Sequence, residues 1–506
     1  MKTVKWGSLA IACLAQLLLA IDLTVLHLAL PSLVTDLAPT ATQQLWIGDM
    51  YGFALAGLLI TMGNLGDRIG RKKLLLIGAV AFGAASALTA YAPNTELLIA
   101  ARALLGVAGA TIMPSTLSII RNVFTDPAER TMAVGIWSGM GAAGFALGPI
   151  VGGLLLNHFW WGSVFLVNLP VMALVLVGGI LVLPESRNPN PGRIDALSVL
   201  LSVAGVMAVV YALKTGVIDG FAGTVAVAAV GGMVVLALFA WRQVRLAEPL
   251  VDVRLFRHRA FSGAVGANLF AIFGMISLSL IIAQFLQLVL GWTPLQAGLA
   301  SLPGGMAGMV GGVLAGRLVS WWGRNAVVAL GLLLSAVSFL AYSRADLGTT
   351  FLSLLPAMLV GGIGIGFTFA VTNDTILASV PKERAGAAAA ISETAFELGG
   401  SLGIAVLGSI LSGAYRDNLR LPAGIPAQEL PYVTDSLGGA VTVAASLPPE
   451  VAGPVTAAAR TAFVEALQVT ALATAGMLLV LSALALYTLR GVPKVIPEDV
   501  LAQAHS

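Results

Sequence analysis

Long apolar runs are the feature that most limits what this chain can fold into. Each is close to the roughly 20 residues that cross a bilayer as a helix. Backbone polar groups in lipid are satisfied only in helices or closed barrels, and these runs are continuous rather than alternating, which excludes barrel strands. The sequence therefore predicts an all-α integral membrane protein with 14 transmembrane helices. The runs lie at about residues 7–30, 44–65, 74–92, 97–120, 132–156, 163–183, 196–213, 222–241, 260–289, 297–316, 326–343, 351–378, 386–413 and 462–489.

Composition excludes several classes of function. Only 10% of the 506 residues are charged, against about 25% in soluble domains, so a soluble enzyme is excluded. One cysteine and four histidines leave little for a metal centre or a catalytic site. There is no GxxxxGK[ST] loop for nucleotide hydrolysis. We expect no cofactor and no metal, and an ion gradient as the energy source.

The basic residues indicate the orientation in the lipid bilayer. With a cytoplasmic N-terminus, most of the 27 Lys and Arg fall in inner segments, and both termini are then predicted to be cytoplasmic. This bias also explains the basic excess without a nucleic-acid partner. The outer loops would hold Lys214, Arg344, Arg416, Arg420 and Arg460.

The connections between runs predict three parts. The proline-rich stretch PESRNPNPGRID, residues 184–195, is typical of a hinge. We predict an N-terminal six-helix bundle at 1–183, a linker with two additional transmembrane helices at 184–259, and a C-terminal six-helix bundle at 260–506. A long extracellular loop at 415–461 is predicted to form a small helical or hairpin cap. Similar Gly and Arg patterns follow the second and tenth runs, so the halves resemble degenerate copies.

A glycine-rich and basic motif, GNLGDRIGRKK, follows the second run. Its glycines permit a tight turn and close helix approach, and Asp67 can accept hydrogen bonds from helix ends or arginines and so latch one conformation. A simpler alternative is that the cations only set the topology. The residues of this conformational motif are Gly63, Gly66, Asp67, Arg68, Gly70 and Arg71.

A second motif, GFALGPIVGG, lies in the fifth run. Three of its glycines, spaced by four, make one small-residue face for tight helix packing, and its proline weakens the helix so that it can bend. Plain helix packing explains the glycines equally well. The residues are Gly144, Gly148, Pro149, Gly152 and Gly153.

Together with Arg102, Gly106 and Pro114 in the fourth run, these motifs resemble the signature set of the major facilitator superfamily. The fourteen runs, the GPxxGG stretch and PLVDVRLF (249–256) are similar to its fourteen-helix drug:proton antiporters of the QacA, LfrA and SmvA type. The resemblance implies a 6 + 2 + 6 arrangement, a bacterial plasma-membrane location and a monomer.

The same resemblance implies a function. It is the proton-driven efflux of small lipophilic, mostly cationic drugs: quaternary ammoniums, dyes, viologens and, as further candidates, fluoroquinolones. An alternative is an exporter of an endogenous metabolite or lipid that carries drugs adventitiously. A membrane-embedded enzyme is a third reading, which the scarcity of His and Cys disfavours.

Acidic residues within the apolar runs are candidates for proton coupling and substrate binding, because a charge at a helix centre costs about 2.5–3.5 kcal/mol. Helix depth places Asp22, Asp49 and Arg102 in the outer half of the N-terminal bundle, where the three can meet. A structural ion pair between Asp22 and Arg102 is an open alternative. Asp374 lies near the inner end of its run, and a contact at the inner gate is as compatible with this place as a direct role.

Glu393 and Glu397 are four residues apart and share one helix face. Two neighbouring carboxylates in a low dielectric repel each other, so at least one should hold a proton at neutral pH unless a cation replaces it. We expect Glu397, near mid-span, to be a shared site for proton and cationic substrate. Asp49 is the rival for this role.

Overall fold

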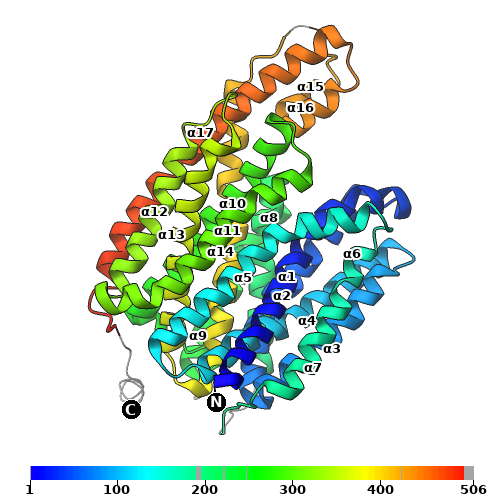
Figure 1. Cartoon of the computed structure of the whole chain (residues 1–506). Helices are drawn as coiled ribbons and strands as arrows, with labels where there is room; N and C mark the ends of the chain where they lie inside the picture. The colour runs from blue at the N-terminus through cyan, green and yellow to red at the C-terminus, as the bar shows by residue number, and fades with distance from the viewer. Residues whose placement is uncertain (1, 190–194, 220–222, 247, 423, 495–506) are drawn as a thin grey trace.

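The computed structural model describes residues 2–189, 195–219, 223–246, 248–422 and 424–494. Within these ranges the ordered elements are helices, and no strand occurs (Figure 1). Fourteen helices are long and apolar enough to cross a membrane. The predicted number of spans is therefore confirmed.

The first half of the chain forms six of these spans, the last of which is broken into two helices. Local signals fix several starts: Thr40 and Gln43 form a capping box before α2, Asn94 caps α4, and Asp126 caps α5 ahead of Pro127. The helices are α1 (Lys2–Leu37), α2 (Ala41–Ile69), α3 (Arg71–Ala90), α4 (Thr95–Val123), α5 (Pro127–Leu156), α6 (Ser163–Leu166) and α7 (Asn168–Val182).

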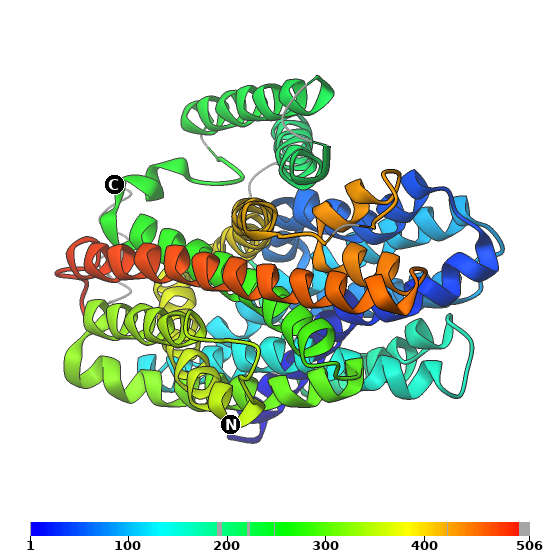
Figure 2. The same cartoon turned by 90° about the horizontal axis from the view of Figure 1, so that it is seen from above.

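Two further spans, α8 (Ala196–Asp219) and α9 (Thr224–Arg245), lie side by side at the edge of the bundle (Figure 2). Helix α8 packs against α2 and α14, so it contacts both halves of the protein. The prediction that Lys214 lies in an outer loop is wrong. It belongs to α8 itself, because this helix continues past the end of its apolar run.

The second half forms the remaining six spans, the three short turns η1, η2 and η3, and the two short helices α15 and α16. The elements are η1 (Val253–Arg257), α10 (Arg259–Gln284), η2 (Phe285–Val289), α11 (Pro294–Trp322), α12 (Arg324–Tyr342), α13 (Phe351–Ala378), η3 (Lys382–Arg384), α14 (Ala385–Asn418), α15 (Leu430–Asp435), α16 (Leu437–Ala444) and α17 (Pro449–Thr488).

Helices extend into both ends of the segment 415–461. Helix α14 continues to Asn418 and α17 begins at Pro449, so Arg416 and Arg460 belong to helices and not to the predicted outer loop. The short helices α15 and α16 lie between them, beside the first turns of α17 (Figure 1). Tyr415 Oη donates a hydrogen bond of 3.0 Å to the carbonyl of Val433, which ties α15 to the end of α14.

The start of α1 and the end of α17 lie at the same end of the bundle, at the bottom of Figure 1. We name this the lower end, and the end that carries α15 and α16 the upper end. The two halves cross closely where α2 meets α14 and where α5 meets α11. A Cβ atom on Gly63 would overlap the carbonyl oxygen of Gly386, and one on Gly135 would overlap the backbone of Gly312. Glycine is therefore required at these crossings.

Candidate functional site

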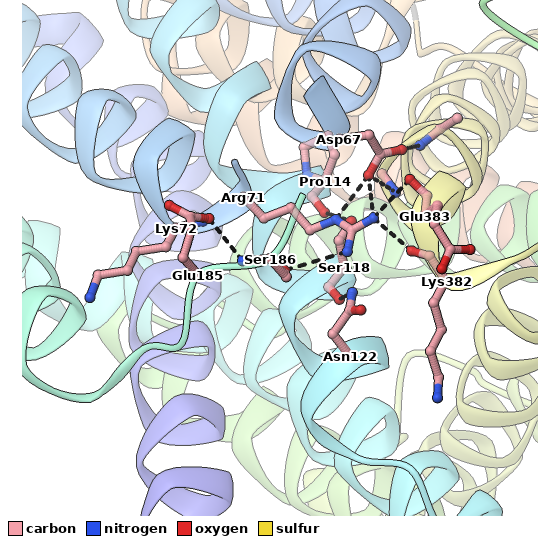
Figure 3. A network of polar contacts seen from close by, with 12 residues as sticks. Asp67, Arg71, Lys72, Pro114, Ser118, Asn122, Glu185, Ser186, Lys382 and Glu383 are labelled. Carbon is pink, nitrogen blue, oxygen red and sulfur yellow. Dashed lines mark hydrogen bonds and ion pairs between the residues drawn. The ribbon is translucent and has the colours of Figure 1, made fainter. Parts of the chain in front are cut away.

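A first ionic network joins the two halves at the lower end (Figure 3). Arg71 Nε donates to Asp67 Oδ1 at 2.9 Å, and Arg71 Nη2 donates to the carbonyl of Lys382 at 2.7 Å. Asp67 also accepts from the backbone N–H groups of Gly386 at 2.9 Å and Ala387 at 3.1 Å, at the start of α14. Asp67 thus accepts bonds from an arginine and from a helix N-terminus, the two kinds of donor that the sequence predicted.

The segment that follows α7 runs against this network. The Arg71 N–H donates to the carbonyl of Ser186 at 3.0 Å, and the Asn188 N–H donates to the carbonyl of Asp67 at 2.6 Å. The Glu185 carboxylate accepts from the backbone N–H groups of Lys72 and Lys73, both at 3.2 Å, as a cap on the start of α3. Residues 184–189 of the predicted hinge are therefore bonded to the α2–α3 turn; residues 190–194 lie outside the described residues.

Asp374 is the centre of a second network at the lower end. It accepts from Arg130 Nε at 2.5 Å, from Arg324 Nη2 at 2.7 Å and from Thr131 Oγ1 at 3.0 Å. Arg130 belongs to α5 in the first half, whereas Arg324 and Asp374 belong to the second. Asp374 thus ties α5 of the first half to α12 of the second half at the lower end.

Asp22 and Arg102 form a buried pair within the first half. Arg102 Nη1 lies 3.2 Å from Asp22 Oδ2, Asn168 Nδ2 donates to Asp22 Oδ1 at 2.8 Å, and the guanidinium lies 4.9 Å from the centre of the Tyr51 ring. These contacts compensate both charges locally. The pair therefore matches the structural alternative given for these two residues.

The prediction that Asp49 meets Asp22 and Arg102 is wrong. Asp49 Oδ1 instead accepts from Lys214 Nζ of α8 at 2.6 Å. The reason is helical geometry: Tyr51 faces Arg102, and a residue two positions earlier lies about 200° around α2. Asp49 therefore faces outward to the added helix.

A cavity lies between the two halves, above the lower-end networks. Glu393 lines it, whereas Glu397 is not among the lining residues. Five helices contribute to its wall. The lining residues are Gln16 of α1; Trp137, Ser138, Gly141, Ala142 and Phe145 of α5; Asn268 and Met275 of α10; Phe369 and Asn373 of α13; and Ser392, Glu393 and Phe396 of α14.

Several polar groups of this cavity lack partners. Within the part of the chain that the structure describes, Trp137 Nε1, Gln16 Oε1 and Asn268 Oδ1 make no hydrogen bond. The amide of Asn268 donates to Asn373 Oδ1 at 3.2 Å and to Ser392 Oγ at 3.0 Å. These bonds hold α10 against α13 and α14 beside the cavity. Unpaired buried polar atoms are costly, so they are available to a bound molecule.

The Glu393 carboxyl is the charge-bearing group of this cavity. Its residue is 4% exposed, and neither a hydrogen bond nor an ion pair to it is found among the described residues. Four of the lining side chains are aromatic: Trp137, Phe145, Phe369 and Phe396. A carboxyl group among aromatic faces offers a flat organic cation both charge compensation and cation–π contact.

Glu397, one turn above, has different surroundings. It is half-buried and interacts electrostatically with Lys214 of α8 and with Tyr51 of α2. The two glutamates still repel each other. Helix α14 therefore presents the Glu393 carboxyl group to the central cavity and the Glu397 carboxyl group to the side of α2 and α8.

The glycines of the fifth span pack α5 onto α1. Added Cβ atoms would contact Ala20 from Gly144, Thr24 from Gly148 and Val25 from Gly152. Gly153 faces open space, and Pro149 lies inside the continuous helix α5. Three of the glycines thus form the small-residue face that the spacing predicts.

The sequence reasoning missed Gln16, Asn268 and Asn373 as site residues and misplaced Lys214. The signal that could have found them is the presence of an amide or an ammonium in an otherwise apolar helix. No group of three or more His, Cys, Asp or Glu that could hold a metal is found among the described residues.

Comparisons with known proteins give one consistent family. The family model described as "Major Facilitator Superfamily" matches residues 12–404. The "Multidrug efflux pump LfrA" of Mycolicibacterium smegmatis is 46% identical over 481 residues, 95% of each chain. The "Methyl viologen resistance protein SmvA" of Salmonella typhimurium is 37% identical and covers 96% of this chain and 98% of its own.

A solved structure has the same fold. The human organic anion transporter MFSD10 (TETRAN) matches with a TM-score of 0.61 at 14% identity and covers 96% of this chain and 99% of its own. At this identity, the match concerns the fold alone.

Proposed function

Because this chain belongs to the major facilitator superfamily and is a multi-pass protein of the bacterial plasma membrane, we propose that it exports lipophilic, mostly cationic drugs in exchange for protons. The observation that carries the proposal is the unpaired Glu393 carboxyl in an aromatic cavity between the two halves. The names of two relatives, a multidrug efflux pump and a methyl viologen resistance protein, support drug export.

Competition at Glu393 would couple the two flows. The ionised carboxylate binds a cation, and a proton on the same group removes the charge that holds the cation. Each ligand then weakens the binding of the other by the same factor. Drug release to the outside follows when a proton enters, and the inward proton gradient drives the cycle.

The lower-end networks would act as the inner gate. With both termini in the cytoplasm, as the Lys and Arg bias favours, the bonds of Asp67 and Asp374 hold the protein closed on the inside. Opening the cavity to the cytoplasm requires that both networks break. We further propose that residues 1–183 and 260–506 are the two halves that rock around the cavity, and that the working unit is a monomer.

Quaternary ammoniums, dyes such as ethidium, viologens and fluoroquinolones are the proposed substrates. The test is ethidium transport by the purified protein in proteoliposomes under an imposed pH gradient. We expect transport without ATP that stops when an uncoupler collapses the gradient. Transport that follows a Na⁺ gradient, and ignores the pH gradient, would contradict the proton coupling. Absence of transport for every cation tested would contradict the substrate class.

A further inference from the structure

Lys214 is a cation in the upper part of the peripheral helix α8. Its Nζ donates to Asp49 Oδ1 of α2 at 2.6 Å, and it also interacts with Glu397 of α14. The same Nζ lies 5.2 Å from the centre of the Phe53 ring. The ammonium group thus lies between the Asp49 carboxylate and the Phe53 ring, and it acts electrostatically on Glu397 of the other half.

Further aromatic rings extend this environment. The ring of Phe53 lies 5.9 Å from that of Trp46 and 6.4 Å from that of Tyr211, centre to centre. Carboxyl groups combined with several aromatic faces are the features by which proteins bind organic cations. We name this place, defined by Asp49, Phe53, Tyr211 and Glu397, the α8 site.

We propose that the α8 site is a second binding site for cationic substrates, and that Lys214 is a tethered cation that a substrate displaces in order to bind there. The proposal rests on the proposed function in one respect, that the transported molecules are cations. The Lys214 and Asp49 side chains are 29% and 32% exposed, so the pair is accessible. A partly exposed pair is held less strongly than a fully buried one, so a substrate cation can displace it.

The Lys214 ammonium competes effectively because its side chain holds it next to the site. A group held by a short linker acts at an effective concentration in the millimolar range, so a free cation must compete with it continually. Removing the ammonium should therefore tighten cation binding at this site by about ten-fold or more. If Lys214 only holds α8 against α2, removing its ammonium should leave the cation affinity unchanged and lower the thermal stability.

The experiment measures ethidium affinity by fluorescence polarisation with the protein in lipid nanodiscs. The Glu393→Gln background weakens the central cavity, so that the α8 site dominates the signal. We expect Lys214→Gln to lower the Kd about ten-fold, and Lys214→Arg, which keeps a tethered cation, to leave it unchanged. Adding Asp49→Asn should remove the gain. An unchanged Kd in Lys214→Gln would overturn the proposal.

A chemical restoration separates charge from structure. Cys13 is the single native cysteine, so Lys214→Cys in a Cys13→Ala background can be modified at one position. Treatment with 2-aminoethyl methanethiosulfonate restores an ammonium, whereas methyl methanethiosulfonate adds a neutral group through the same disulfide. Only the ammonium should weaken ethidium binding back to the level of Lys214. Equal effects of both reagents would overturn the proposal.

Failure of this proposal is distinguishable from failure of the proposed function. If the unmodified protein shows no gradient-driven cation transport, the proposed function is wrong. A protein that transports ethidium, and whose affinity is the same with and without the ammonium at position 214, contradicts only the role of Lys214.

Discussion

The lower end and the central cavity both contain buried carboxyl groups, but those at the lower end are paired with arginines and, in the ranges that the structure describes, the one in the cavity is not. Asp67 and Asp374 are each bonded to arginine, and each joins one half of the protein to the other. Glu393, at a similar degree of burial, has no such partner among the described residues. A paired charge stabilises one conformation, whereas an unpaired one is left for a ligand or a proton.

This difference distinguishes the lower-end networks from the central cavity more clearly than their depth in the membrane does. Both regions lie between the two halves, and both use α5, α13 and α14. What distinguishes them is whether arginine supplies the counter-charge. Changing the charge at each place therefore tests the distinction.

The largest effect is expected from Asp374→Asn. The change leaves Arg130 and Arg324 buried without their counter-charge, which typically costs about 3–5 kcal/mol. The closed lower end should lose population. Electron–electron distances between spin labels at Lys73 and Arg317, on opposite halves of the lower end, should lengthen.

The matched control for Asp374 is Glu129→Gln, which removes an exposed ion pair with Lys5 of 2.8 Å at the same end. Such pairs contribute under about 1 kcal/mol, and both residues belong to the first half. The label distances should stay as in the native protein. Equal opening in both variants would show that burial of the network does not matter.

Glu393→Gln should weaken ethidium binding by about 2–5 kcal/mol, the usual cost of removing one member of a buried charge pair. In the native protein the Kd should rise as the pH falls, because the protonated carboxyl cannot compensate the cation. The variant should bind equally weakly between pH 6 and pH 8.

Glu397→Gln on the same helix is the control for Glu393. Glu397 belongs to the α8 site and does not line the cavity, so the pH dependence that Glu393 produces should remain. If instead Glu397→Gln removes the pH dependence and Glu393→Gln keeps it, then Glu397 is the shared site for proton and cation, as the sequence predicts, and Glu393 is not.

Gly63→Ala should destabilise the closed lower end by about 1–3 kcal/mol through overpacking, because its Cβ overlaps the Gly386 carbonyl. Gly153→Ala has open space around the new methyl group and should stabilise its helix by up to about 1 kcal/mol. Melting temperatures in one detergent should move in opposite directions. A shift of the same sign in both would contradict the close crossing.

The smallest effect concerns Asp195, at the start of α8. Hydrogen bonds from Arg242 and Ser198 hold the pKa of its carboxyl below the ordinary value. A lowered pKa stabilises the folded state above the unfolded-state pKa of about 4, and the effect is lost as the pH falls below it. Asp195→Asn should cost under about 1 kcal/mol at pH 7, since the pair is exposed.

The stability of the Asp195→Asn variant relative to the native protein, measured by thermal melts from pH 3 to pH 7, checks this expectation. The difference should be present at pH 7 and shrink toward pH 3. A difference that grows as the pH falls would contradict the sign of the pKa shift.

Much of the fold was predictable because hydropathy is a local property. A span can be recognised from about 20 consecutive residues, so the fourteen helices and the family motifs followed from the sequence alone. Helix ends were less predictable: α8 continues beyond its apolar run, which carried Lys214 from a predicted loop into the helix.

The sequence by itself determined which residues are costly to bury, and so it singled out Asp22, Asp49, Asp374, Glu393 and Glu397. It could not determine which partner each carboxyl group meets, because every partner lies on another helix and depends on how the helices rotate against each other. The tertiary structure alone decided that arginines pair with Asp22 and Asp374, that Lys214 pairs with Asp49, and that Glu393 faces the cavity. Electrostatic pairing acts over a few ångströms in space, a distance that the order of residues along the chain does not record.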